Sequence, residues 1–296
     1  MGELISLLED GLHTWRRNLR LCVPHILEFV FVYAFSILYI VVVLMLVFLA
    51  GYAFFPGLNL QEGLSQEMIS SYTGLLLVAV LVLLALLIFY LLVTVLISSF
   101  FTAGAVGISG EALTKGETTL SAMLIYGRKK ALSLFALNLF IYLVYLVAGL
   151  VLLGLFIGLP HLMGYSLGEG GLLIISFQVI GLIVSVICFI LLTLLFAPVQ
   201  YAIVLSNLGF KDGLRKGIYF FMENRISVFA LSFITCVLTV LFEIINQLCQ
   251  FITEYLPPVV DLMMYLAWLF IYVAVLTCIL APLYTLWWSR LYLSKT

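Results

Sequence analysis

Long uninterrupted runs of apolar residues alternate with short polar segments along this chain. Six runs are long enough to cross a bilayer, since about 20 apolar residues span the ~30 Å hydrocarbon layer as a helix. They cover residues 26–54, 74–100, 132–158, 172–196, 226–251 and 262–288. None shows the alternation of a barrel strand, and backbone groups in lipid must be bonded within their own segment. The pattern predicts an all-α polytopic membrane protein with six transmembrane helices.

The polar segments between the runs differ in charge. All 13 Lys and Arg residues precede the first run, follow the sixth, or lie between the second and third or the fourth and fifth runs. In the three remaining loops the charged residues are all Asp or Glu. Because Lys and Arg accumulate in cytoplasmic loops, we expect a multi-pass protein of the cell membrane with both N- and C-termini in the cytoplasm. An odd number of spans would break this pattern.

Composition agrees with a membrane protein: 65% of the residues are hydrophobic and 9% are charged. A soluble domain carries about 25% charged residues. The formal net charge of −1 gives no general attraction to nucleic acid, so no nucleic-acid partner is expected. The five cysteines form no CxxC pair and have no His at metal-ligand spacing, so the sequence predicts neither a metal site nor a cofactor.

The short segments that precede the odd spans resemble one another. Residues 11–18 and 217–224 match most closely, and residues 120–130 match more weakly. The ends of the even spans also correspond at Ala103-Gly104, Ala197-Pro198 and Ala281-Pro282, where proline is expected to close or bend the helix. We therefore expect a single membrane domain over residues 1–296 built from three parallel repeats, approximately 1–104, 105–200 and 201–296. Each repeat would hold an interfacial helix and two spans.

A few short motifs carry a resemblance to a known group. They are Asp10-Gly11 with Asn18 and Pro24, Gly217 with Asn224, and Ala197-Pro198. In these features the chain resembles uncharacterised prokaryotic (archaeal-type) six-span membrane proteins, which are related to the membrane domain fused to some glycerophosphodiester phosphodiesterases. The resemblance implies the six-span fold. The phosphodiesterase catalytic domain has no counterpart in this sequence, so that activity is not expected.

The fifth span contains a carboxylate inside an apolar run. Glu243 is followed by Asn246, Gln247 and Gln250, a spacing that places all four on one helical face. An ionisable group within a span is a candidate functional site. We expect either a polar cavity open to the outside or a polar face that is solvated because the helix projects beyond the bilayer.

His25 and Glu28 form a second candidate, an inner-interface pair three residues apart near the start of the first span. They could bind a proton, a metal or a lipid headgroup, or they could pair with neighbouring arginines at the interface. Asn138 and Gln178 are single amides inside the third and fourth spans, where such groups commonly form hydrogen bonds between helices.

No catalytic motif of the HExxH, GxSxG or phosphate-loop type is found, so an enzyme is not expected. We expect a non-enzymatic membrane module that associates with lipids, including anionic headgroups at the inner face, or with a membrane complex, a protein partner or a second copy. A small permease for a lipidic or neutral solute, using the polar face around Glu243, is the alternative. An intramembrane enzyme that acts on lipid headgroups is the remaining hypothesis.

Overall fold

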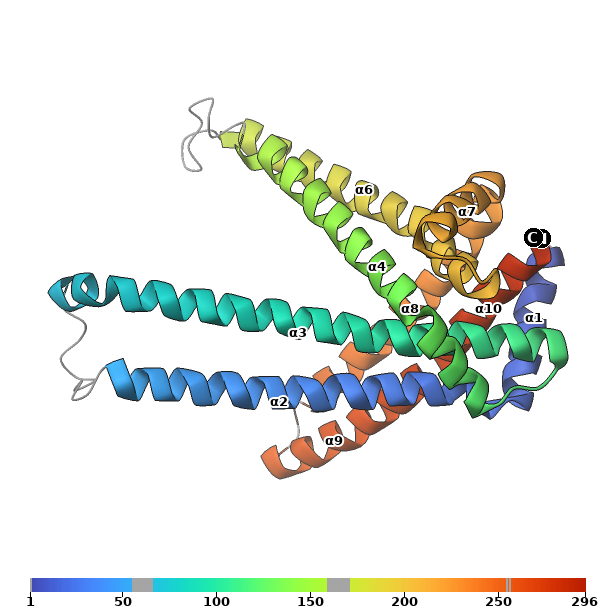
Figure 1. Ribbon diagram of the computed structural model, residues 1–296, viewed down its shortest axis with the longest axis horizontal. Coiled ribbons are helices and arrows are strands. Elements are labelled where there is room, and N and C mark those ends of the chain that lie inside the picture. Colours follow the sequence, from blue (N-terminus) through green and yellow to red (C-terminus); the bar gives the residue numbers. More distant parts are fainter. Residues whose placement is uncertain (1, 55–65, 159–170, 254, 256) are drawn as a thin grey trace. The chain divides into compact units, whose positions relative to one another are not determined.

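The computed structural model describes the chain except for residues 1, 55–65, 159–170, 254 and 256 (Figure 1). In these described parts the ordered elements are helical. They are α1 (Gly2–Arg17), a 3₁₀ turn η1 (Leu19–Cys22), α2 (Val23–Phe54), α3 (Gln66–Lys115), α4 (Leu120–Leu153), the π-helical turn η2 (Gly154–Gly158), α6 (Gly171–Leu205), α7 (Phe210–Glu223), α8 (Arg225–Thr253), α9 (Pro258–Val275), the π-helical turn η3 (Leu276–Leu280) and α10 (Ala281–Lys295).

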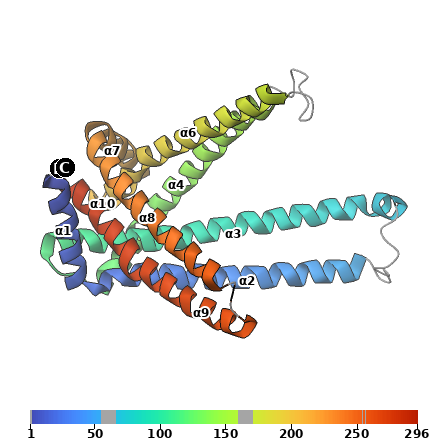
Figure 2. The same cartoon turned by 180° about the vertical axis from the view of Figure 1, so that it is seen from behind.

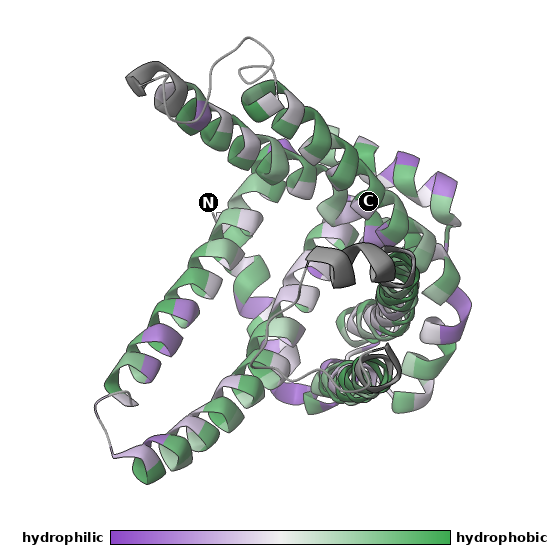
Figure 3. Ribbon diagram, turned by 90° about the vertical axis from the view of Figure 1, so that its left-hand side faces the viewer, coloured by the Kyte–Doolittle hydropathy of each residue, from purple (hydrophilic) through white to green (hydrophobic). Residues whose placement is uncertain are grey.

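Six helical stretches in the described chain are long and apolar enough to cross a membrane. They cover Leu19–Leu49, Leu77–Lys115, Leu120–Gly158, Ser176–Leu205, Arg225–Thr253 and Pro258–Lys295. Each overlaps one span predicted from the sequence, so the all-helical fold class and the six long apolar helices are confirmed. Figure 3 shows these helices as predominantly hydrophobic along their length.

The chain forms two compact units. One comprises Leu27–Ser98 and holds the greater part of the α2–α3 pair. There, Tyr90 of α3 stacks on Phe35 and Tyr39 of α2, and its hydroxyl lies 2.8 Å from Ser36 Oγ. The other unit comprises Met1–Ile26 and Ser99–Thr296 and contains the candidate site residues other than Glu28.

The buried core of the larger unit gathers at one end of its long helices. Most of its members come from the last part of α3, the last part of α6 and α10, and others come from α1, α4, α7 and α8. Among the buried side chains of the first three helices are Ala103, Val106, Ile108, Val199, Ala202, Ile203, Leu286, Leu291 and Tyr292. The rings of Tyr201 and Trp288 stack there at 5.9 Å between α6 and α10. The same end carries the basic segments of the sequence, so tight packing and positive charge occur together.

Each polar segment that precedes an odd span packs on the end of an even span. The beginning of α4 contacts α3, where a Cβ added to Gly104 would lie 2.7 Å from Met123 Cγ. α7 contacts α6, where a Cβ on Gly217 would lie 2.5 Å from Val199 Cα. The missing side chains therefore allow close helix approach at both places.

The third such contact joins the two ends of the chain. α1 lies beside α10 (Figure 2), and Gly11 is placed directly against the indole of Trp287. Trp287 Nε1 also donates a hydrogen bond to the carbonyl oxygen of Leu8 at 3.1 Å. The three contacts are alike. The start of α4 packs on α3 and α7 packs on α6, in each case on the helix that comes before it, whereas α1 packs on the last helix, α10.

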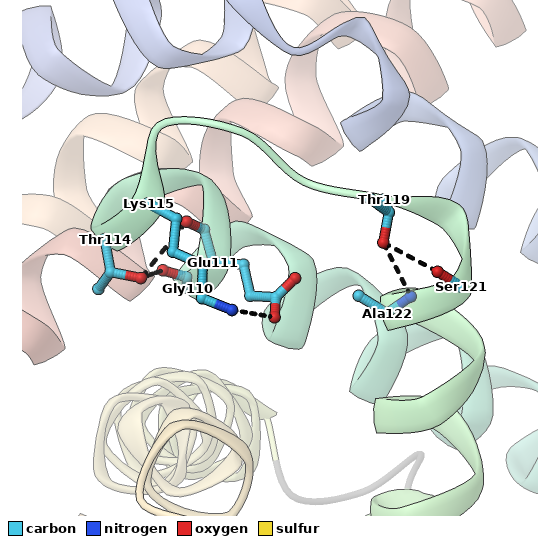
Figure 4. A network of polar contacts seen from close by, with 7 residues as sticks. All are labelled: Gly110, Glu111, Thr114, Lys115, Thr119, Ser121 and Ala122. Carbon is cyan, nitrogen blue, oxygen red and sulfur yellow. Dashed lines mark hydrogen bonds and ion pairs between the residues drawn. The ribbon is translucent and has the colours of Figure 1, made fainter.

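The linkers after α3 and α6 are built alike. Each contains a residue in the left-handed region, Gly116 with φ 84° and Asn207 with φ 55°. At the first linker Thr119 caps α4 by accepting a hydrogen bond from Ala122 N–H at 3.3 Å, and Lys115 pairs with Glu111 at 2.9 Å (Figure 4). Residues in the left-handed region commonly end helices, so the backbone turns sharply in both linkers before the next helix begins.

The predicted closure of the fourth helix at Pro198 is wrong, because α6 continues through Pro198 to Leu205. α3 likewise continues beyond the predicted span, to Lys115. A proline removes one helical hydrogen bond, which neighbouring packed helices can compensate for. Residues 120–130 are not a separate interfacial helix either: they form the first turns of α4, which continues without a break to Leu153.

Candidate functional site

A polar stripe runs along one face of α8. Its members recur every three or four residues and are Thr235, Thr239, Glu243, Asn246 and Gln250. Positions three and four apart lie on the same side of a helix. Among the six long apolar helices, α8 separates its polar and apolar faces most clearly. The predicted polar face is therefore part of a longer feature than Glu243 and its three neighbours.

Aromatic side chains of the next helix bind the centre of this stripe. Tyr272 of α9 donates its hydroxyl to Glu243 Oε1 at 2.5 Å, and Asn246 Nδ2 donates to Glu243 Oε2 at 3.3 Å. Trp268 Nε1 donates to Asn246 Oδ1 at 2.9 Å. Both carboxylate oxygens of Glu243 thus accept hydrogen bonds from protein groups.

Hydrogen bonds continue toward both ends of the stripe, from another helix at one end and within α8 at the other. Thr239 Oγ1 lies 3.1 Å from the hydroxyl of Tyr284 on α10, which also donates to the Thr235 carbonyl at 3.3 Å. Gln250 Nε2 donates to Asn246 Oδ1 at 3.2 Å. The structure therefore brings together three of the four predicted residues and leaves Gln247 on the exposed side of the helix. Chemically, the arrangement is an interhelical hydrogen-bond network around one carboxylate.

His25 and Glu28 have different hydrogen-bond partners. His25 Nε2 lies 3.4 Å from Thr285 Oγ1 of α10, whereas Glu28 accepts a hydrogen bond from Ser98 Oγ of α3. No group of three His, Cys, Asp or Glu residues suited to a metal ion occurs in the described ranges. Asn138 donates to Ser99 Oγ at 2.9 Å, between α4 and α3, as expected for an amide between helices.

Cys278 presents its carbonyl oxygen to the N-terminal segment. In a regular helix this oxygen would accept the N–H four residues later, but that residue is Pro282, which has none. Trp15 Nε1 donates to it at 2.9 Å and Cys22 Sγ at 3.0 Å. The π-helical turn η3 lies at this point, where the helix pattern changes.

A pocket of about 420 Å³ lies between α1, the beginning of α8 and the end of α10. Its size is within the range of small-ligand sites. The polar residues that line it are Ser6, Asp10, Ser227, Arg290, Ser294 and Lys295. The apolar ones are Leu4, Leu7, Ile226, Ala230 and Leu291.

The described lining of this pocket includes an ion pair. Arg290 Nη2 and Asp10 Oδ2 form an ion pair at 2.9 Å across the α1–α10 contact. Lys295, near the end of α10, also lines the pocket. α8 also begins here, at Arg225, and the first N–H groups of a helix lack acceptors within it and favour negative charge. The pocket thus places charged and apolar side chains next to one another.

Sequence reasoning missed this pocket and the partners of Glu243. Arg290 and Lys295 were explained by topology alone, and α1 and α10 are far apart in the sequence. Tyr272 and Trp268 carried a usable signal, because aromatic residues with a polar tip are expected to find partners when they lie inside a span.

The fold and these sites define a class: a helical protein with six long apolar helices and a packed, charged end. Residues 91–293 match the sequence profile of a family described as a domain of unknown function, DUF7847, and the chain belongs to that family. The match begins in the second half of α3 and ends in α10. No curated protein and no solved structure matches the chain.

Proposed function

We propose that this protein is a non-enzymatic module of the cell membrane that crosses the bilayer six times. Both termini lie in the cytoplasm, and three parallel repeats form the module. Its role is to hold membrane lipid or a membrane partner at the packed inner end. Six long apolar helices and the placement of all 13 basic residues support this arrangement.

One observation carries the proposal: the buried core, the amphipathic helices α1 and α7 and the basic segments share one end of the larger unit. Amphipathic helices with basic residues bind the interface of anionic membranes. Several polar side chains inside the spans, by contrast, form hydrogen bonds between helices, as at Glu243–Tyr272 and Asn138–Ser99. These interhelical bonds stabilise the fold and leave the inner end as the place for association.

The repeat is supported by position as well as by packing. Asn18, Lys130 and Asn224 each stand four residues before a buried side chain, namely Cys22, Leu134 and Val228. Asn18 and Asn224 both donate to the carbonyl four residues earlier, in Thr14 and Phe220. Three segments with corresponding residues at corresponding places favour a parallel threefold arrangement.

A second candidate function is a small permease for a lipidic or neutral solute. Glu243 favours it, because a carboxylate within a span commonly marks a solute or proton path. Gln247 and Gln250 are exposed beside it and extend the polar surface.

Experiments on the full chain purified from membranes distinguish the two proposed functions. Under our proposal, native mass spectrometry finds retained lipid or a stable protein partner, and proteoliposomes containing the protein show no flux of neutral solutes above that of empty vesicles. Solute flux that is lost in Glu243→Gln would favour the permease and contradict the proposal.

A further inference from the structure

We propose that a pocket between α4 and α6 holds a membrane lipid by one hydrocarbon chain, with the amide of Gln178 bound to the oxygen that links this chain to glycerol. The inference rests on one part of the proposed function, namely that these helices cross a membrane. It goes beyond that function by assigning a lipid site away from the packed inner end.

Two aromatic contacts hold α4 and the π-helical turn η2 beside α6 (Figure 1). Tyr145 packs edge-on against Phe189 with 5.6 Å between ring centroids, and Phe156 lies 5.4 Å from Phe177. A pocket of about 410 Å³ lies between these two contacts, and its size is within the range of small-ligand sites. Because the two segments contact each other on either side of it, the pocket is a feature of the packed helix pair.

The walls of this pocket are mostly apolar, with Leu152, Phe156 and Phe189 among them. Gly149 leaves room in the wall, since a Cβ added there would meet no atom nearer than 3.8 Å. On the rim Leu153 is 57% and Leu182 66% exposed, so the pocket opens away from the core. In a membrane it therefore opens toward lipid chains. Apolar atoms that line a void lack contact partners, and a hydrocarbon chain would supply them.

The pocket also contains a polar side chain without a partner. Ser185, on its wall, donates to the Gly181 carbonyl at 2.7 Å. The half-buried Gln178 amide, by contrast, forms no hydrogen bond with any residue that the structure describes, so the bond between helices that the sequence suggested is not found there. An unpaired amide in apolar surroundings costs free energy. A ligand oxygen that accepts from Gln178 Nε2 would offset this cost.

The depth of Gln178 selects the part of the ligand that it meets. About 27 Å of helix separates Gln178 from Phe196, the inner end of the predicted span, at ~1.5 Å per residue. Since the hydrocarbon layer is ~30 Å thick, Gln178 lies near its outer edge. The oxygens that link lipid chains to glycerol lie at this level, directly above the chains. One lipid can thus meet both the amide and the apolar walls. The π-helical turn η2 contributes to the same pocket, and such turns are frequent at functional sites.

The test is photolabelling of the purified full chain with a diacylglycerol that carries a diazirine in one acyl chain. Diacylglycerol has chains and linkage oxygens but no phosphate, so a charged headgroup makes no contribution. Labelled peptides are located by mass spectrometry. Unlabelled diacylglycerol and hexadecane, which lacks oxygen, are added separately as competitors.

Two variants change the pocket in different ways, and each has a matched control. Gln178→Met removes the amide at similar volume, and Gln247→Met makes the same change at an exposed amide of α8 outside the pocket. Gly149→Leu fills the pocket, and Gly154→Leu adds the same side chain where nothing lies within 4 Å of an added Cβ. If Gly149→Leu loosens the helix pair, Gln178→Met still tests the assignment.

In the wild type we expect saturable labelling within residues 149–157 and 178–189, with diacylglycerol competing better than hexadecane. Gln178→Met should weaken competition by diacylglycerol about threefold, as expected for loss of an average hydrogen bond within a membrane protein. Gly149→Leu should abolish the labelling, and both controls should behave like the wild type. Equal competition by hexadecane, unchanged competition in Gln178→Met, or undiminished labelling in Gly149→Leu would each overturn the assignment.

Failure of this assignment is distinguishable from failure of the proposed function. If only the assignment is wrong, labelling spreads over the apolar helices and the pocket variants do not change it, while lipid or partner is still retained at the inner end. If the role of the inner end is wrong, the wild type retains neither there or its proteoliposomes conduct solute, whereas the pocket is still labelled. Both are wrong if the protein is recovered from cells without detergent.

Discussion

Trp15 donates its indole N–H to the carbonyl oxygen of Cys278 at 2.9 Å, and so joins the end of α1 to the turn that precedes α10. The acceptor is available because Pro282 cannot supply the N–H that a regular helix would use. A carbonyl oxygen just before α10 thus receives its hydrogen bond from a side chain of α1. This bond and the Gly11–Trp287 contact together hold α1 against the last helix of the described chain.

This relationship predicts a dependence between the two sites. Trp15→Phe keeps an aromatic ring at this position but removes the N–H donor. The loss of this hydrogen bond should lower the free energy of unfolding by about 1 kcal/mol. In a Pro282→Ala background the backbone N–H returns, so the same Trp15→Phe change should cost less. Chemical unfolding of the four purified variants measures the coupling. Equal costs in both backgrounds would mean that the carbonyl of Cys278 does not need Trp15.

The glycines at the helix contacts should not tolerate side chains. Gly217→Leu places a Cβ 2.5 Å from the backbone of Val199, and Gly11→Leu places one against Trp287. Overpacking of this kind costs about 1–3 kcal/mol. We expect the larger loss at Gly217, because backbone yields less than a side chain. Gly209→Ala is the control, since nothing lies within 4 Å of its added Cβ. Thermal unfolding that is equal in all three would contradict close packing there.

The Glu243–Tyr272 hydrogen bond should be measurable as an interaction between helices. Glu243→Leu and Tyr272→Phe each remove one partner, and a double-mutant cycle should give a coupling of about 0.6 kcal/mol, at most about 1.7 kcal/mol. Glu243→Gln keeps an oxygen acceptor for the Tyr272 hydroxyl and should cost less than Glu243→Leu. Gln247→Leu, on the exposed side, should leave stability unchanged. Additive effects of the two changes would show that α8 and α9 do not depend on this bond.

Lys130 and its neighbour Lys129 should respond differently to loss of charge. Lys130 is 6% exposed and donates to the Leu208 carbonyl at 2.8 Å, whereas Lys129 is exposed. Lys130→Met removes a charged donor from a part-buried hydrogen bond and should lower the free energy of unfolding by about 1–3 kcal/mol. Lys129→Met removes the same charge at the surface and should change it by less than about 0.5 kcal/mol. Similar values for both would indicate that only net charge matters in this segment.

The long helices could be predicted from the sequence because their signal is local. Twenty consecutive apolar residues identify a span whatever surrounds it. Helix ends could not be read in the same way: α3 and α6 continue past residues 100 and 196 because their last turns are buried among other helices of the core. That burial depends on contacts between distant segments, such as Gly217 with Val199, which no window of sequence contains.

The candidate sites divide in the same way. Glu243, Asn246 and Gln250 were found because one helix presents them at regular spacing. Their partners Tyr272 and Trp268, on the next helix, were not paired with them because the register between two helices is set by packing. The pocket beside Arg290 could not be predicted from the sequence at all, because its lining comes from three helices, α1, α8 and α10, that are far apart along the chain.

The orientation of the protein in the membrane tests the central claim most directly, because the packed basic end must face the cytoplasm. Single cysteines are introduced at Lys115 and Lys211, and at Ser65 and Gly170 in the two loops outside the described residues, in a background without the five native cysteines. An impermeant thiol reagent added to intact cells should label the positions 65 and 170 and leave 115 and 211 unlabelled until the cells are opened. Labelling of the Lys115 or Lys211 position from outside would contradict both the topology and the function built on it.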